Sequence, residues 1–129
     1  MLPLAIRLAA LVPVLAGGGG ALFGPAFLGE AGGPATSSQV RYLSGLLLGI
    51  GLLAWWCAAA LPRRAGVFGV LCAIVTLGGL ARLCGLAVDP LPPWPHLAAL
   101  VMELGVVPAL WFAAHRTAAC GQSRSAQGS

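Results

Sequence analysis

The sequence predicts an all-α membrane protein, a bundle of four transmembrane helices with an antiparallel, up-and-down topology. Hydrophobic residues fill 59% of the 129 positions and charged residues only 8%, whereas soluble domains contain about 25% charged residues. Four apolar runs, each close to the roughly 20 residues that one membrane crossing needs, occupy almost the whole chain. We therefore expect one membrane domain over residues 1–116 and no separate soluble domain.

The first apolar run covers about residues 4–23, with Arg7 near its start, Pro13 in its middle and four glycines near its end. A positive residue, an apolar core and small residues also fit a secretory signal peptide. The run approaches spanning length, however, and no A-x-A cleavage site follows it. We expect a retained first helix, and a mature N-terminus between residues 20 and 35 would contradict this expectation.

The second run follows a stretch of turn-forming residues. Residues 24–39 are rich in Gly, Pro, Ser and Thr and contain Glu30, which is typical of a long loop. The apolar residues 40–61 then continue without a break as far as Pro62. A helix over 40–61 is the prediction for the second span.

The third and fourth runs are separated by prolines. Arg63 and Arg64 form a short basic turn before the third span, which we expect over residues 66–88. Residues 89–95 (DPLPPWP) hold four prolines and cannot be helical, so the fourth span is expected over 96–115. The small, polar residues 117–129 predict a disordered cytoplasmic tail.

Arginine placement predicts the orientation of the helices, because basic residues are retained on the cytoplasmic side of short loops. Glu30 and Asp89 fall on one side of a chain that crosses four times. The other side holds Arg7, Arg63, Arg64, Arg116 and Arg124. Both termini are therefore expected in the cytoplasm. The arginines are scattered singly rather than clustered on one face, which excludes nucleic acid as a partner.

Two ionisable residues lie well inside predicted spans, Arg82 in the third and Glu103 in the fourth. Each is costly in hydrocarbon unless it is paired or hydrated. At about 1.5 Å per residue, both lie roughly 10 Å from the outer helix ends. Helices joined by a short connection pack as antiparallel neighbours, so we predict an ion pair between Arg82 and Glu103.

Two further polar residues complete the candidate site. Arg41, at the outer end of the second span, shares a face with Gly45 and Gly49, a small-residue pattern typical of helix packing. We therefore expect Arg41 to point inward. His96 precedes Glu103 by seven residues and lies on the same helix face. The candidate binding residues are Arg41, Arg82, His96 and Glu103.

Pro108 removes one backbone hydrogen bond just after Glu103, so we expect the fourth helix to bend there. Such a bend would open space beside the carboxylate.

Several functions are compatible with these residues. The Arg82–Glu103 pair could bind the head of a small anionic or amphipathic molecule, or it could only fix packing in a structural or accessory subunit, or lie at a homodimer contact. An enzyme would use Glu103 as a general acid or base, but no nucleophile, metal motif or cofactor motif accompanies it, so we expect no cofactor and favour a non-enzymatic role. A small multidrug exporter would need an acidic residue in the first helix, which has none.

Short apolar strings along the chain resemble a known family. They are LFGP at 22–25, RYLSG at 41–45, GIGL at 49–52, LGGLARL at 77–83, and Glu103-Leu104 with Pro108. Over about residues 4–116 the chain resembles the bacterial four-helix membrane proteins grouped as the DUF4345 domain, loosely associated with DoxX-like proteins. The resemblance implies a four-helix fold in a bacterial inner membrane, and it implies no activity.

Overall fold

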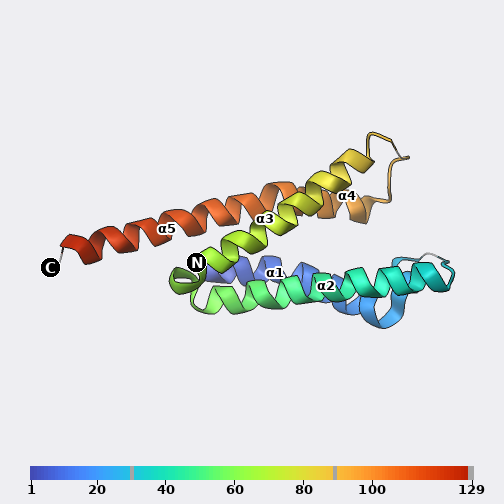
Figure 1. Ribbon diagram of the computed structural model, residues 1–129, viewed down its shortest axis with the longest axis horizontal. Coiled ribbons are helices and arrows are strands. Elements are labelled where there is room, and N and C mark those ends of the chain that lie inside the picture. The colour runs from blue at the N-terminus through green and yellow to red at the C-terminus, as the bar shows by residue number, and fades with distance from the viewer. Residues whose placement is uncertain (30, 89, 128–129) are drawn as a thin grey trace. The chain divides into compact units, whose positions relative to one another are not determined.

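The computed structural model describes residues 1–29, 31–88 and 90–127, and side chains as far as residue 117. Within these residues four helical stretches are long and apolar enough to cross a membrane. Three of them contain α1 (Leu2–Phe23), α2 (Pro34–Ala59) and α3 (Leu61–Gly85), and the fourth joins α4 (Trp94–Val101), the π-helical turn η2 (Met102–Val106) and α5 (Val107–Gln127) (Figure 1). The prediction of an all-α protein with four transmembrane helices is confirmed.

The chain divides after Ala59 into two compact units, each of which is a helical hairpin. The first hairpin contains α1, the 3-10 helix η1 (Gly24–Leu28) and α2. The second hairpin contains α3, α4, η2 and α5.

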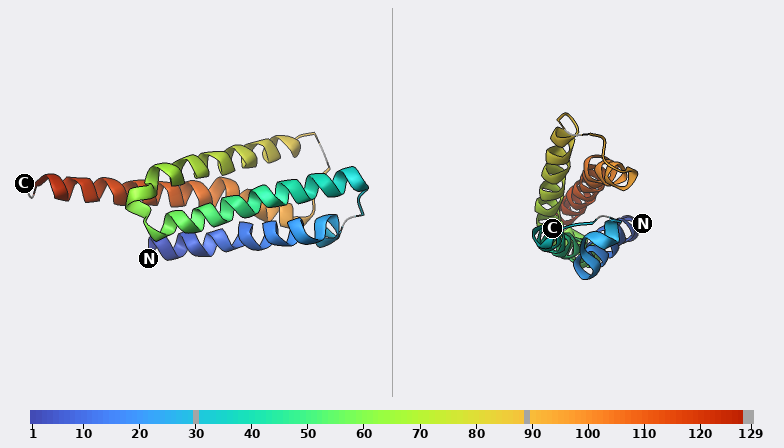
Figure 2. Two further views of the ribbon diagram at one scale, coloured as in Figure 1. Left: turned by 60° about the horizontal axis from the view of Figure 1, so that its bottom comes forward. Right: turned by 90° about the vertical axis from the view of Figure 1, so that its right-hand side faces the viewer.

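Glycines bring the two helices of the first hairpin into close contact. Gly17 is buried against the backbone of α2, so that a Cβ built on it would lie 2.7 Å from the Ser44 carbonyl oxygen. Gly51 is buried in the same way against Val14 of α1. Because residues early in α1 meet residues late in α2, the two helices run antiparallel, and they lie side by side in both ribbon views (Figures 1 and 2).

The second helix begins earlier than the sequence predicts. It starts at Pro34, six residues before the expected position 40, and ends at Ala59 rather than 61. Proline is well suited to the first helical turn because its missing N–H has no partner there, and the Ser37 N–H bonds to the Gly33 carbonyl at 2.9 Å. The expected loop over 24–39 is therefore mostly helical, since η1 occupies its first residues. Turn-forming composition alone did not distinguish a loop from an exposed helix end.

The third helix also begins earlier than expected, at Leu61 rather than 66. The backbone N–H groups of Arg63 and Arg64 both bond to the Ala60 carbonyl at 3.1 Å. The basic pair therefore lies in the first turn of α3 and not in a connecting turn. The helix then ends at Gly85, three residues before the predicted position 88.

The second hairpin is antiparallel as well, because Gly79 in α3 contacts Glu103 and Leu104, whereas the earlier Gly69 contacts Trp111. The fourth span begins at Trp94, two residues before the predicted 96, and its helix continues to Gln127, into the stretch for which the sequence predicts a disordered tail.

A π-helical turn interrupts the fourth span at the place where the sequence predicts a bend. The Val107 N–H bonds to the Met102 carbonyl, five residues back instead of four. Pro108 follows immediately, and its ring would clash with the Leu104 carbonyl in a regular α-helix. The wider turn gives that carbonyl room, so the proline explains the position of the π-helical turn.

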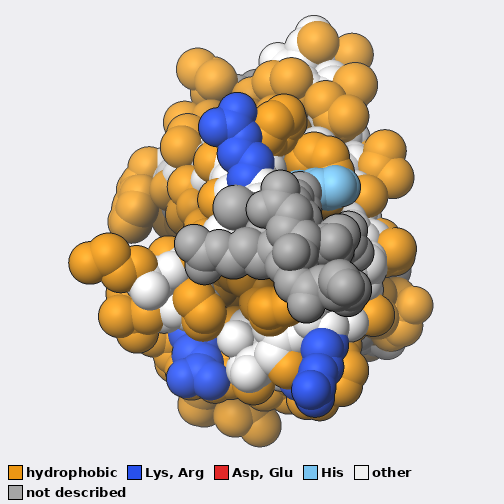
Figure 3. Space-filling model, turned by 90° about the vertical axis from the view of Figure 1, so that its left-hand side faces the viewer, with side chains coloured by type: hydrophobic (Ala, Val, Ile, Leu, Met, Phe, Trp, Pro, Cys, Tyr) orange, Lys and Arg blue, Asp and Glu red, His pale blue; other side chains and the backbone are white. Residues whose placement is uncertain are grey.

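Most of the described surface is apolar. In Figure 3 hydrophobic side chains cover much of the face in view, and leucines, valines and aromatic residues are exposed along all four spans. Such a surface suits hydrocarbon and would not be stable in water. The chain is therefore an integral membrane protein.

Candidate binding site

An ion pair joins α3 to the π-helical turn of the second hairpin. The Nε atom of Arg82 donates to Oε2 of Glu103 at 3.3 Å, and its Nη2 donates to Oε1 at 3.4 Å. This two-pronged geometry matches the fork of the guanidinium to both carboxylate oxygens. The side chains are 38% and 19% exposed respectively. The ion pair predicted from the sequence is confirmed.

His96 in α4 binds the same guanidinium from another direction. Its Nδ1 atom lies 3.1 Å from Nη1 of Arg82. Arginine has only donors, so Nδ1 must accept the hydrogen bond, and its lone pair must be free of a proton. The geometry therefore requires a neutral imidazole with its hydrogen on Nε2.

Gly79 sets the distance between α3 and the π-helical turn. It is buried one turn before Arg82, and a Cβ built on it would lie 2.9 Å from the Cβ of Glu103. A larger residue would push the carboxylate away from the guanidinium. Gly78 has open space instead, so only one of the two neighbouring glycines has this role.

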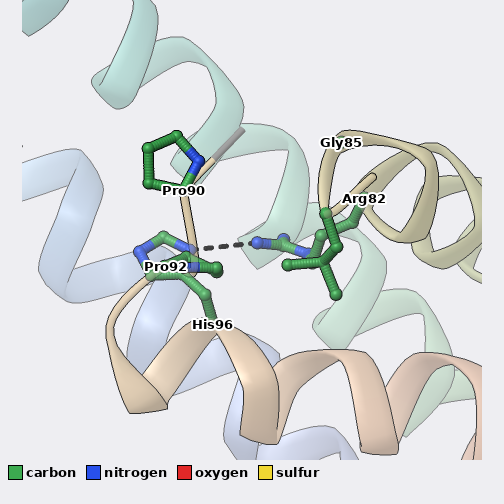
Figure 4. Close-up of a pocket in the computed structure, with 6 residues that line it drawn as sticks. Arg82, Gly85, Pro90, Pro92 and His96 are labelled. Carbon is green, nitrogen blue, oxygen red and sulfur yellow. Dashed lines mark hydrogen bonds between the residues drawn. The ribbon is translucent and has the colours of Figure 1, made fainter. Parts of the chain in front are cut away.

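A hollow lies beside Arg82 and His96, two of the three linked side chains, at the end of the second hairpin that holds the connection from α3 to α4. Its volume is about 220 Å³, and its lining residues are Arg82, Gly85, Leu86, Pro90, Pro92 and His96. Figure 4 shows Arg82 and His96 pointing toward each other from α3 and α4, with the two prolines on the connecting segment. Asp89 lies outside the described residues. The hollow combines polar groups from two helices with a mostly apolar wall.

Arg41 has a different environment from the other predicted site residues. It lies in the first hairpin, where its Nη1 donates to the carbonyls of Ala21 and Leu22, both at 2.7 Å. These carbonyls end α1 and have no partner within the helix. Arg41 therefore caps the C-terminal end of α1, and its described contacts are with backbone rather than with an acidic side chain.

Within the first hairpin, residues other than Gly45 and Gly49 provide the close contact with α1. Gly45 and Gly49 are exposed, and a Cβ on either would meet nothing within 4 Å. Ser44 provides the contact instead, against Gly17 and Gly20 of α1. A glycine pair on one helix face did not reveal which face the partner helix covers.

The walls of the hollow were not predicted. Leu86, Pro90 and Pro92 belong to the connection that the sequence marks only as non-helical. The signal that could have found them is the density of prolines, which stiffens the connection. In the part of the chain that the structure describes, no three His, Cys, Asp or Glu side chains gather in a way that could hold a metal ion.

The fold and these side chains define a small integral membrane protein of two helical hairpins, one of which carries a polar cluster beside a hollow. The family model DUF4345, a domain of unknown function, matches residues 1–114. The chain therefore belongs to the DUF4345 family, as the short strings in its sequence indicated. Comparison with curated proteins and with solved structures gave no match.

Proposed function

We propose that this protein binds a small anionic or amphipathic molecule in the membrane, with the polar head of that molecule in the hollow beside Arg82 and His96. The observation that carries the proposal is the hollow itself. It adjoins a guanidinium that is 38% exposed, although Glu103 and His96 already bind it. A pair that served packing alone would not need an adjoining space.

The size of the hollow indicates what part of a ligand it holds. Pockets that enclose a whole drug-sized molecule are usually 300–1,000 Å³, whereas this hollow is about 220 Å³. It suits a head group, while an apolar remainder would lie along the exposed hydrophobic residues of the helices. Amphipathic molecules in a bilayer have this form.

We place the protein in a bacterial inner membrane with both termini in the cytoplasm, because Arg63 and Arg64 at the start of α3 and Arg116 in α5 lie at the same end of the antiparallel second hairpin. The hollow then faces the outer side. Two reporter enzymes can be fused after Arg116, one that works only in the cytoplasm and one that works only in the periplasm. Only the cytoplasmic form is expected to be active. Activity of the periplasmic form would reverse the orientation.

The binding proposal is tested by identifying what purifies with the protein. Mass spectrometry of the wild-type protein is expected to find an anionic or amphipathic small molecule above the level of bulk lipid, and Arg82→Gln is expected to lose it. Arg63→Gln is the matched control, since Arg63 lies exposed in the first turn of the same helix. Equal recovery from all three proteins, or bulk lipid alone, would contradict the proposal.

A structural role is the second candidate, and the contact between Gly79 and Glu103 favours it, because this contact locks the α3 register to the π-helical turn. Exchanging the charges, with Arg82→Glu and Glu103→Arg together, separates the two functions. If the pair only fixes packing, the protein should keep most of its stability after the exchange. A binding site should lose its ligand even when the exchanged protein folds.

A further inference from the structure

We infer that the hollow selects a neutral head group that accepts hydrogen bonds, such as the carbonyl of an ester or ketone, in preference to an anion. This inference rests on the proposed function and names the ligand class for the same site. It follows from the charges and the hydrogen-bond roles of three side chains.

The first step is the charge of the cluster. Arg82 brings one positive charge, and Glu103 cancels it at 3.3 Å. His96 is neutral, because its Nδ1 accepts from Arg82. The three side chains together carry no net charge. An anion in the hollow would therefore add an uncompensated negative charge near the Glu103 carboxylate, and a partly buried charge without a partner is costly.

The second step is the count of donors. A guanidinium has five N–H groups, and three of them bind Glu103 and His96. Among the described residues the remaining two, one on each terminal nitrogen, have no partner. The Nε2–H of His96 is a third donor, since the accepting Nδ1 fixes the tautomer.

The third step is what these donors can bind. Gly85, Leu86, Pro90 and Pro92 complete the wall, and none of them has a side-chain donor or acceptor. A carbonyl oxygen has two lone pairs and no charge, so it can accept from these donors without disturbing the Arg82–Glu103 pair. An apolar molecule that ends in a carbonyl satisfies both the donors and the charge balance.

The test compares three probes with the same apolar chain, methyl decanoate, decanoate and decane, on the protein in nanodiscs. Binding is measured by native mass spectrometry and corrected for partition into protein-free nanodiscs. Methyl decanoate is expected to bind at least about tenfold more tightly than either of the others, which corresponds to about 1.4 kcal/mol. Tighter binding of decanoate, or equal binding of decane, would overturn the inference and leave the proposed function standing. No binding of any probe would overturn the proposed function.

A charge variant provides an independent readout. Glu103→Gln keeps the shape of the side chain and removes its charge, so Arg82 becomes an uncompensated cation. The preference is expected to invert, with decanoate binding more tightly than the ester. Arg63→Gln, which changes the net charge of the protein far from the cluster along α3, should keep the preference for the ester. An unchanged preference in Glu103→Gln would show that the charge balance does not select the ligand.

A measurement on the unaltered cluster covers the case in which Glu103→Gln does not fold. Nitrogen-15 NMR of labelled histidine is expected to show His96 with one protonated ring nitrogen, Nε2, whose signal shifts when methyl decanoate is added. The variant His115→Gln removes the only other histidine and assigns the signal. A doubly protonated His96 at neutral pH, or a signal that the ester does not shift, would overturn the inference.

Discussion

Each hairpin contains an arginine with a different kind of hydrogen-bond partner. In the first, Arg41 donates to two backbone carbonyls at the end of α1. In the second, Arg82 binds the side chains of Glu103 and His96. Both arrangements solve the same problem, since a polar group in an apolar protein needs a partner.

This difference between the partners of Arg41 and Arg82 indicates where a ligand could bind. Backbone carbonyls at a helix end need a donor from outside the helix, and Arg41 is that donor at the end of α1. Arg82 and Glu103 form an ion pair, and a hollow lies beside Arg82. The first arrangement is explained by the helix end that Arg41 caps, whereas in the second the guanidinium of Arg82 also borders a hollow.

Adding a single methyl group at Gly17 should disrupt the packing of the first hairpin, with the largest loss of stability among these variants. Gly17→Ala places a Cβ less than 3 Å from backbone atoms of α2, which cannot move out of the way separately. We expect a loss of about 3 kcal/mol in the free energy of unfolding, measured by titration with denaturing detergent. Gly18→Ala is the control, because its Cβ meets nothing within 4 Å. Equal losses in both variants would show that helix contact is not the cause.

The arginines should differ in the stability that they provide. Arg82→Gln leaves the Glu103 carboxylate, which is 19% exposed, without its partner. We expect a loss of about 2 kcal/mol, below the value for a fully buried pair because solvent and head groups reach the site. Arg41→Gln should cost less than about 1 kcal/mol, because Arg41 is exposed and the α1 carbonyls can bind water. A larger loss from Arg41→Gln would reverse the comparison between the hairpins.

The glycine contact of the second hairpin should be more tolerant than that of the first. A Cβ on Gly79 would meet the Glu103 and Leu104 side chains, which can move, rather than backbone. Gly79→Ala is therefore expected to cost about 1 kcal/mol and to lengthen the contact between Arg82 and Glu103. Gly78→Ala, next to it in open space, should have no such cost. If Gly79→Ala were as destabilising as Gly17→Ala, the π-helical turn would have to be rigid.

Much of the fold could be predicted from the sequence, because a helix that crosses hydrocarbon needs about 20 apolar residues. The four apolar runs became four spans, and the Arg82–Glu103 pair followed from two charges at matched depth. Helix ends were predicted less well. Pro34 and Leu61 begin helices several residues before the apolar runs do, because a helix can extend beyond the hydrocarbon where polar residues are tolerated.

The candidate site was predicted in part for a similar reason. Depth along a helix is set by residue number, so Arg82, His96 and Glu103 could be brought together from the sequence. The partner of Arg41 could not, because backbone carbonyls occur at every position and leave no signal in the residue types. The walls of the hollow depend on the path of the proline-rich connection between α3 and α4. Hydrophobic periodicity predicts helices, but it does not predict the path of a non-helical segment.

The Arg82–Glu103 pair also has a consequence for how the chain enters the membrane during synthesis. The two residues are 21 positions apart, so Arg82 reaches the insertion machinery before the residue that neutralises it. An unpaired arginine at the centre of a span opposes insertion by about 2.5–3.5 kcal/mol, and Arg82, in the last turn of α3, should oppose it by less. We therefore expect α3 to insert more efficiently when the following span, which carries Glu103, is present than when it is absent. Nascent chains that end before Glu103 should insert α3 less efficiently than chains that continue past it, which a glycosylation-mapping assay would detect.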